Sequence, residues 1–230
     1  MKGLAKLEKI LGIDFKNKNI LTEAITHRSY LNEHPEYKLD HNERLEFLGD
    51  AVLELVVTEH LYQKYPNPEG DLTNWRASLV NGANLAKIAR EIGLEEFIVM
   101  SKGETKDANS KARQYILANA MEAVIGAIYL DHGIKEAKKF IEKNILNDLA
   151  EIIKNKLYID PKSLFQEKSQ EIAGVTPNYK VLESAGPDHN KTFRVGVFLD
   201  KELIADGTGT SKQEAQIEAA KKALKNKKWD

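Results

Sequence analysis

Apolar residues recur at steps of three and four positions through most of the first 156 residues, the spacing that gathers them on one face of an α-helix. The clearest case is Glu43–Tyr65, which the turn-forming sequence Tyr65-Pro66-Asn67-Pro68 brings to an end. The same spacing predicts four later helices: one capped by Asp71 or Thr73, one from about Asn84, one over 111–130, and one over Ile134–Lys156. The polar stretch 105–110 predicts a loop.

The pattern changes after residue 160. Asp160-Pro161 predicts the start of a helix that runs to about Ile172, since proline is favoured in a first helical turn. Thr192–Leu199 then alternates apolar and polar residues, the period of a half-buried strand. Strands are predicted over 179–183, 192–199 and 203–206, followed by a helix over 211–225. We therefore predict an all-α domain over 1–156, a linker over 157–160, and a small α+β domain of order α-β-β-β-α over 161–230.

Composition and charge narrow the possible functions. The chain has no cysteine, which excludes disulfides and thiolate metal sites and fits a cytoplasmic protein. It contains no apolar run near the roughly 18 residues of a membrane span, so no membrane association is expected. Residues 1–160 carry 22 Lys and Arg against 25 Asp and Glu, a net charge of −3, whereas residues 161–230 carry 12 against 10, a net charge of +2. Any cationic surface for nucleic acid therefore belongs to the C-terminal part.

One helix collects carboxylates on a single face. Glu43, Glu46 and Asp50 stand at i, i+3 and i+7, so their side chains project from the same side. Like charges at this spacing repel, and a divalent cation would offset the repulsion. Oxygen ligands suit Mg²⁺ or Mn²⁺. A solvated acidic face remains the alternative at this point.

A second helix adds polar residues to an otherwise apolar segment. Asn119 and Glu122 interrupt the apolar residues of 116–128. A buried carboxylate without a partner costs several kcal/mol or becomes protonated. A metal ion shared with Glu46 and Asp50 would stabilise both helices, and a salt bridge to Arg44, Arg76 or Arg113 is the alternative.

These residues resemble a known family. The segment HNERLEFLGDAVLELV at 41–56 closely resembles the signature of ribonuclease III. Four further blocks resemble that family in order and spacing: THRSY at 26–30, EGDL at 69–72, RASLV at 76–80, and AVIGAIYLD at 123–131. The C-terminal segment resembles a double-stranded RNA-binding domain. The resemblance covers nearly the whole chain, and it implies a nuclease domain followed by an RNA-binding domain.

The resemblance also implies roles for the carboxylates. Glu46, Asp50 and Glu122 match inner metal ligands, of which Asp50 and Glu122 are the least dispensable, and Glu43 and Glu69 match acidic positions near the cleft and the dimer interface. The fourth inner ligand is normally Asp, and this chain has Asn119, which keeps one carbonyl oxygen but loses a charge. Lower metal affinity is therefore expected.

The implied reaction is hydrolysis of double-stranded RNA that depends on Mg²⁺, with Mn²⁺ as an alternative cation. It leaves 5′-phosphate and 3′-hydroxyl products with staggered ends and takes part in rRNA and mRNA processing. Family members act as homodimers through the catalytic domain. The apolar residues around Phe47, Leu48 and Val52 are candidates for either that interface or the core.

Three regions of the C-terminal domain match RNA contacts of the family. They comprise Gln166 and Glu167 on its first helix, His189 in a loop between strands, and Ser211 and Lys212 at the start of its last helix. Ser211 and Glu214 also predict a capping box. Family members commonly carry more basic residues where Gln213 and Gln216 stand, so weaker and more salt-sensitive binding is expected.

Two other functions remain open. The first is a double-stranded RNA-binding protein in which Asn119 has weakened or abolished cleavage. The second is a carboxylate-bridged di-iron protein, which would want Glu-x-x-His, a spacing that neither Glu46 nor Glu122 provides. His27 and Trp75 are expected to be structural residues.

Overall fold

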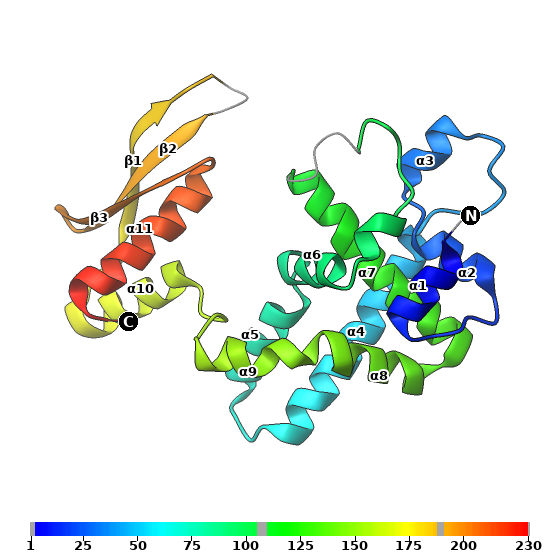
Figure 1. Cartoon of the computed structure of the whole chain (residues 1–230). Coiled ribbons are helices and arrows are strands. Elements are labelled where there is room, and N and C mark those ends of the chain that lie inside the picture. Colours follow the sequence, from blue (N-terminus) through cyan, green and yellow to red (C-terminus); the bar gives the residue numbers. More distant parts are fainter. Residues whose placement is uncertain (1–2, 105–109, 188–190, 230) are drawn as a thin grey trace. The chain divides into compact units, whose positions relative to one another are not determined.

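The computed structural model describes residues 3–104, 110–187 and 191–229. The chain divides into two compact units, Met1–Tyr158 and Ile159–Asp230, and the division falls within the segment 157–160 that the sequence predicts to join two domains (Figure 1). Among the described residues, no helix is long and apolar enough to cross a membrane.

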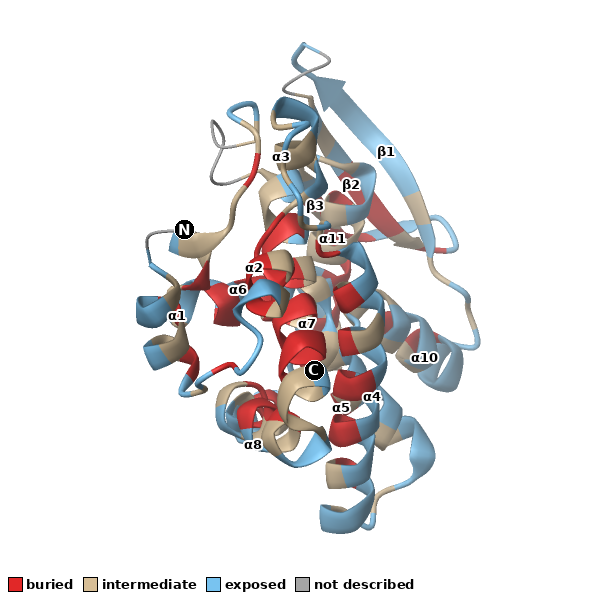
Figure 2. Cartoon of the chain, turned by 90° about the vertical axis from the view of Figure 1, so that its right-hand side faces the viewer, coloured by how far each residue is buried: buried red, intermediate tan, exposed pale blue. Residues whose placement is uncertain are grey.

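The first unit consists mainly of helices. Its elements are α1 (Leu4–Leu11), α2 (Lys18–Ala24), α3 (Arg28–Glu33), α4 (Glu43–Lys64), α5 (Glu69–Val80), α6 (Gly82–Glu91), the 3₁₀ turn η1 (Leu94–Phe97), α7 (Lys111–His132), α8 (Ile134–Asn144), η2 (Leu146–Asp148) and α9 (Leu149–Lys154). The long helix α7 lies at the centre and is buried along most of its length (Figure 2). It packs against α2, α4, α6 and α8.

Two glycines set the distance between α4 and α7. A Cβ atom added to Gly49 on α4 would overlap the carbonyl oxygen of Glu122, and one added to Gly126 on α7 would overlap the carbonyl oxygen of Leu45. Any side chain at either position would therefore force the two backbones apart. Glycine at both positions lets the helices touch main chain to main chain.

Two details of the first unit differ from the sequence-based prediction. The helix expected over Ile134–Lys156 is broken into α8, η2 and α9, because α8 packs on α4 and α7 whereas α9 packs on α5. The chain must turn near Ile145, which is fully buried, to reach both partners. The predicted caps of α5 are also wrong. Pro68 precedes that helix, and Asp71 instead accepts a hydrogen bond from Asn67.

The second unit confirms the predicted α-β-β-β-α order. It comprises α10 (Pro161–Ala173), β1 (Asn178–Ala185), β2 (Thr192–Leu199), β3 (Glu202–Gly209) and α11 (Lys212–Lys227). The strands form one antiparallel sheet in the order β1-β2-β3. Residues of α10, β2, β3 and α11 form its apolar core around Phe165 and Val197. Both outer strands are longer than predicted, because main-chain pairing continues beyond their apolar residues.

The glycine contact between α4 and α7 gives a stability prediction. Gly49→Ala should lower the free energy of unfolding of the first unit by about 3 kcal/mol or more, since neither backbone can move aside easily. The matched control is Gly70→Ala on α5, where an added Cβ meets nothing within 4 Å, and which should leave stability unchanged or slightly raised. Chemical denaturation measures both. Equal stability of the two variants would contradict the close contact.

Candidate functional site

Polar side chains gather where α4 and α7 cross. Glu46 and Asp50 stand on α4 on either side of Gly49, and Asn119 and Glu122 stand on α7 within two turns of Gly126. The Asn119 amide donates a hydrogen bond to the Glu46 carboxyl. Glu122 interacts electrostatically with both Asp50 and Glu46. The helix contact thus brings together the four residues that the sequence singled out as metal ligands.

Burial and neighbouring carboxylates raise the pKa of Glu122 and of Glu46. Burial, followed by the charges of Asp50 and Glu46, raises the pKa of Glu122 to about 8. Burial, followed by the charge of Glu43, also raises the pKa of Glu46, and the hydrogen bond from Asn119 partly opposes that rise. Without a cation, Glu122 is therefore mostly protonated at neutral pH.

The described part of the chain supplies no Lys or Arg partner for Glu46, Asp50 or Glu122. Arg113 pairs with Glu95, with Nε 2.8 Å from Oε1, and Arg76 donates to Thr58 Oγ1 at 3.0 Å. No salt bridge of Arg44 with these carboxylates is present among the described residues either. The salt-bridge alternative from the sequence therefore fails for all three arginines.

The donor chemistry fits a divalent cation. Three carboxyl groups and one amide oxygen are hard ligands, and their charges repel until a cation joins them. Within the described residues, however, no three acidic, His or Cys side chains stand close enough to hold an ion together. Glu46, Asp50, Asn119 and Glu122 are thus neighbours on two helices that do not form a closed metal-binding cage in this structure.

Glu43 lies one turn before Glu46 and is exposed at the mouth of a pocket of about 670 Å³. Its Oε1 lies 3.4 Å from Arg28 Nη1, and its Oε2 lies 3.9 Å from His41 Nδ1. Glu46 and Asn119 line the same pocket. Glu43 is thus the outermost member of an acidic row that leads toward the helix crossing.

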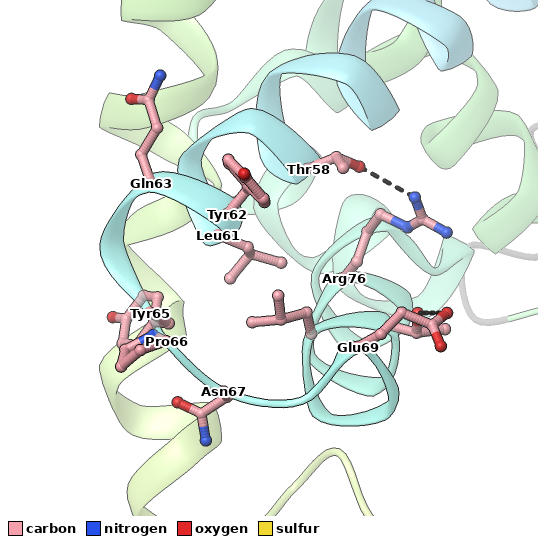
Figure 3. Close-up of a pocket in the computed structure, with 11 residues that line it drawn as sticks. Thr58, Leu61, Tyr62, Gln63, Tyr65, Pro66, Asn67, Glu69 and Arg76 are labelled. Carbon is pink, nitrogen blue, oxygen red and sulfur yellow. Dashed lines mark hydrogen bonds between the residues drawn. The ribbon is translucent and has the colours of Figure 1, made fainter.

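Glu69 occupies a different place. It begins α5 and lines a mainly apolar pocket of about 840 Å³ together with Leu61, Tyr62, Leu72 and Arg76 (Figure 3). The structure therefore does not bring Glu69 to the carboxylates at the crossing within one chain.

Sequence reasoning missed one residue that positions the site. Asn42 is buried, and its N–H donates to the carbonyl of Thr26 at 2.9 Å. Its side-chain amide donates to the carbonyl of Ala24 at 3.4 Å. These bonds fix the start of α4 against the end of α2. A polar residue directly before an acidic helix was the available signal.

The predicted RNA contacts of the second unit lie on its two helices. Gln166 and Glu167 are exposed on α10. Ser211 Oγ accepts from the N–H of Glu214 at 3.2 Å, as a cap requires, but the Glu214 carboxyl accepts from the N–H of Thr210 instead of completing the box at Ser211. Lys212 is exposed, with Nζ 6.0 Å from the centroid of the Phe193 ring. His189 lies outside the described residues.

Comparison with known proteins agrees with this division. A family described as ribonuclease-III-like matches residues 17–149, and one described as a double-stranded RNA binding motif matches residues 161–227. Ribonuclease 3 of Carboxydothermus hydrogenoformans is 47% identical over 97% of this chain and 95% of that protein. Ribonuclease 3 of Nitratiruptor sp. is 44% identical over 98% of this chain and 97% of that protein.

A solved structure supports the assignment of the first unit. The nuclease domain of ribonuclease III from Campylobacter jejuni is 44% identical, with a TM-score of 0.56, and the match covers 64% of this chain and 97% of that one. The two family matches together cover both the helical first unit and the second unit with its antiparallel sheet. The chain belongs to the ribonuclease III family of endoribonucleases that act on double-stranded RNA.

Proposed function

We propose that this chain is a divalent-metal-dependent endoribonuclease that cuts both strands of an RNA duplex and leaves staggered 5′-phosphate and 3′-hydroxyl ends. The observation that carries the proposal is the group of carboxylates at the α4–α7 crossing. Among the described residues, no Lys or Arg side chain forms a salt bridge with Glu46, Asp50 or Glu122. Glu46, Asp50, Glu122 and the carbonyl oxygen of Asn119 would hold Mg²⁺, or Mn²⁺ in its place.

Each side chain has a defined task in this mechanism. When bound, the cation lowers the pKa of a water molecule and offsets charge on the scissile phosphate. Asp50 and Glu122, which interact electrostatically across the two helices, would supply charged ligands from both sides. Asn119 orients Glu46 through its amide hydrogens. Glu43, held between Arg28 and His41, adds negative charge at the entrance and favours the approach of cations.

The second unit would hold the duplex while the first unit cuts it. Duplex RNA is bound through shape, 2′-hydroxyls and phosphates across its minor groove. Gln166 and Glu167 offer hydrogen bonds to hydroxyls, and the capped start of α11, with Ser211 and Lys212, offers N–H groups and a cation to phosphate. His189 completes the set by its match to the family. We propose processing of rRNA and mRNA in the cytoplasm as the cellular role.

We also propose a homodimer, because one site per subunit would explain a staggered cut. Phe47, Leu55 and Tyr62 form a stripe on α4 and are 81%, 62% and 81% exposed, and Tyr62 borders the apolar pocket of Figure 3. Val52, a candidate for either interface or core, is core, with 6% exposure. A second solved structure of the Campylobacter jejuni nuclease domain is described as flexible in a region involved in dimer formation.

Cleavage assays test the metal centre. Long duplex RNA incubated with the protein and Mg²⁺ should give short discrete products, and EDTA should abolish them. Glu122→Gln should lower the cleavage rate on the order of a hundredfold or more, because it removes a charged ligand without changing shape. Duplex binding by Glu122→Gln, measured by gel retardation, should persist. Intact but retarded RNA with the unmodified protein would favour the binding-only alternative.

A second variant in the same assay addresses the unusual ligand. Asn119→Asp should lower the Mg²⁺ concentration that gives half-maximal cleavage, since it restores a charged ligand. Asn19→Asp on α2 adds the same charge at an exposed position and serves as the control. If both variants need the same Mg²⁺ concentration as the unmodified protein, Asn119 is not a ligand.

The pKa of Glu122 predicts how the metal-free protein responds to pH. Its folded-state pKa of about 8 lies above the ordinary value of 4.5, so the unfolded chain loses this proton first as pH rises. Stability of the first unit in chelator should therefore fall between these two values. Glu122→Gln should remove most of that fall, and Mg²⁺ should oppose it. Trp75 fluorescence in a Trp229→Phe background follows this unit alone, and a flat profile for the unmodified protein would contradict the prediction.

Phe47→Asp tests the dimer. A charge in the exposed stripe should convert the dimer to a monomer in sedimentation velocity, because an apolar interface excludes an unpaired carboxylate. Ile172→Asp on α10, where the side chain is 58% exposed, should leave the dimer intact. A monomeric unmodified protein, or a dimeric Phe47→Asp variant, would contradict this proposal.

A further inference from the structure

His27 is fixed at two points beside the acidic row. It precedes α3, and its backbone N–H donates to the carbonyl of Val99 at 2.8 Å. Its ring nitrogen Nδ1 accepts from the N–H of Ser29 at 3.3 Å, which caps the helix. The ring therefore has little freedom to turn, and the expected structural role of His27 accounts for one of its two nitrogens.

The neighbouring serine decides where the ring carries its proton. Ser29 Oγ accepts from the N–H of Ser101 at 3.0 Å and lies 2.8 Å from His27 Nδ1. The hydroxyl hydrogen is thus available to Nδ1, which accepts and carries no proton. In the neutral ring the remaining hydrogen is on Nε2, which becomes a donor. Burial lowers the pKa of His27 and favours this neutral form.

The Nε2–H group has no acceptor in the described part of the chain, although His27 lines the same pocket as Glu46 and Asn119. Arg28 lines this pocket too, and its side chain is 69% exposed. Glu43 and Glu46 form a carboxylate wall of this pocket, and His27 and Arg28 form a donor wall. Glu104 also lines the pocket and interacts electrostatically with His27. A cation alone would use only the carboxylates, whereas a ligand with anionic oxygens beside a metal ion would use both walls.

We propose that His27 and Arg28 bind the sugar–phosphate backbone of the RNA strand being cut, next to the scissile phosphate, with His27 Nε2–H donating to a backbone oxygen. This inference rests on the proposed nuclease function and assigns it two further substrate-binding residues. Because the ring is held before RNA arrives, no side-chain freedom is lost at this position on binding. Arg28 supplies a positive charge where the acidic row would otherwise repel phosphate.

Two substitutions separate the two nitrogens of His27. His27→Asn places an oxygen near the position of Nδ1, so it keeps the helix cap but cannot reach as far as Nε2. Its unfolding temperature should match that of the unmodified protein, while kcat/KM for duplex RNA should fall roughly ten- to hundredfold, the range for one hydrogen bond to a charged group. His27→Gln reaches the Nε2 position and should recover part of the activity despite a weaker cap.

Binding measurements test Arg28 and keep this inference distinct from the nuclease proposal. In the Glu122→Gln background with Mg²⁺, Arg28→Ala should weaken duplex binding and reduce the salt dependence by about one phosphate contact. If the unmodified protein cleaves but His27→Asn cleaves equally well, only the His27 subsite is wrong. If the unmodified protein does not cleave, unchanged binding by both His27→Asn and Arg28→Ala overturns the subsite independently.

The substrate itself identifies the backbone oxygen. Duplexes with 2′-deoxy nucleotides flanking the cut should remove the difference between His27→Asn and the unmodified protein if the acceptor is a 2′-hydroxyl. They should preserve that difference if the acceptor is a phosphate oxygen. Either result supports the subsite, whereas equal kcat/KM on the unmodified duplex overturns it.

Discussion

The main-chain contact between α4 and α7 determines where every candidate ligand stands. Gly49 and Gly126 let the two helices approach until a single added methyl group would overlap the opposing backbone. At that separation Glu46 and Asp50 on one helix interact with Asn119 and Glu122 on the other. Larger residues at the crossing would widen it and separate the carboxyl groups proposed to bind one cation. The close contact between the two backbones is therefore also what brings the candidate ligands together.

This construction places three carboxyl groups close together at a partly buried helix crossing. The raised pKa of Glu122 is the direct sign of the cost of this arrangement, because burial and two neighbouring carboxylates all oppose its ionisation. A bound cation would offset these unfavourable interactions, because it would attract all of the carboxylates at once. Asn119 moderates the problem in a way that Asp could not. Its amide donates to Glu46, and its neutral side chain adds no further repulsion. The same change should weaken the hold on metal, so stability without metal and affinity for metal oppose each other at this position.

Much of the fold and part of the site could be predicted from local sequence pattern. The spacing of Glu43, Glu46 and Asp50 depends only on the helical repeat. The polar residues Asn119 and Glu122 on α7 are conspicuous in an apolar segment. The break between α8 and α9 depends on packing against different helices, which no local pattern records. The cap of α5 depended on Pro68, whose fixed backbone replaced the side-chain cap that Asp71 or Thr73 was expected to supply. The close approach of α4 and α7 likewise could not be predicted, since a glycine within a helix does not show which other helix packs against it.

His27 shows why a structural and a binding role need not be alternatives. From sequence, His27 is expected to be a structural residue, and the structure agrees for Nδ1, which caps α3. An imidazole has two nitrogens, however. The hydrogen bonds made by one nitrogen determine whether the other carries the proton and fix the direction in which that N–H points. The Ser29 hydroxyl and the Ser101 N–H thus influence the pocket by fixing the His27 ring. Neither group needs to contact RNA for this effect. The THRSY segment at 26–30 and the acidic helix 43–64 are joined at Asn42, so the donor wall and the carboxylate wall are held by one local structure. A nuclease that must place both an anion and its counter-cation gains from fixing the two walls together, because their relative position then does not depend on the substrate.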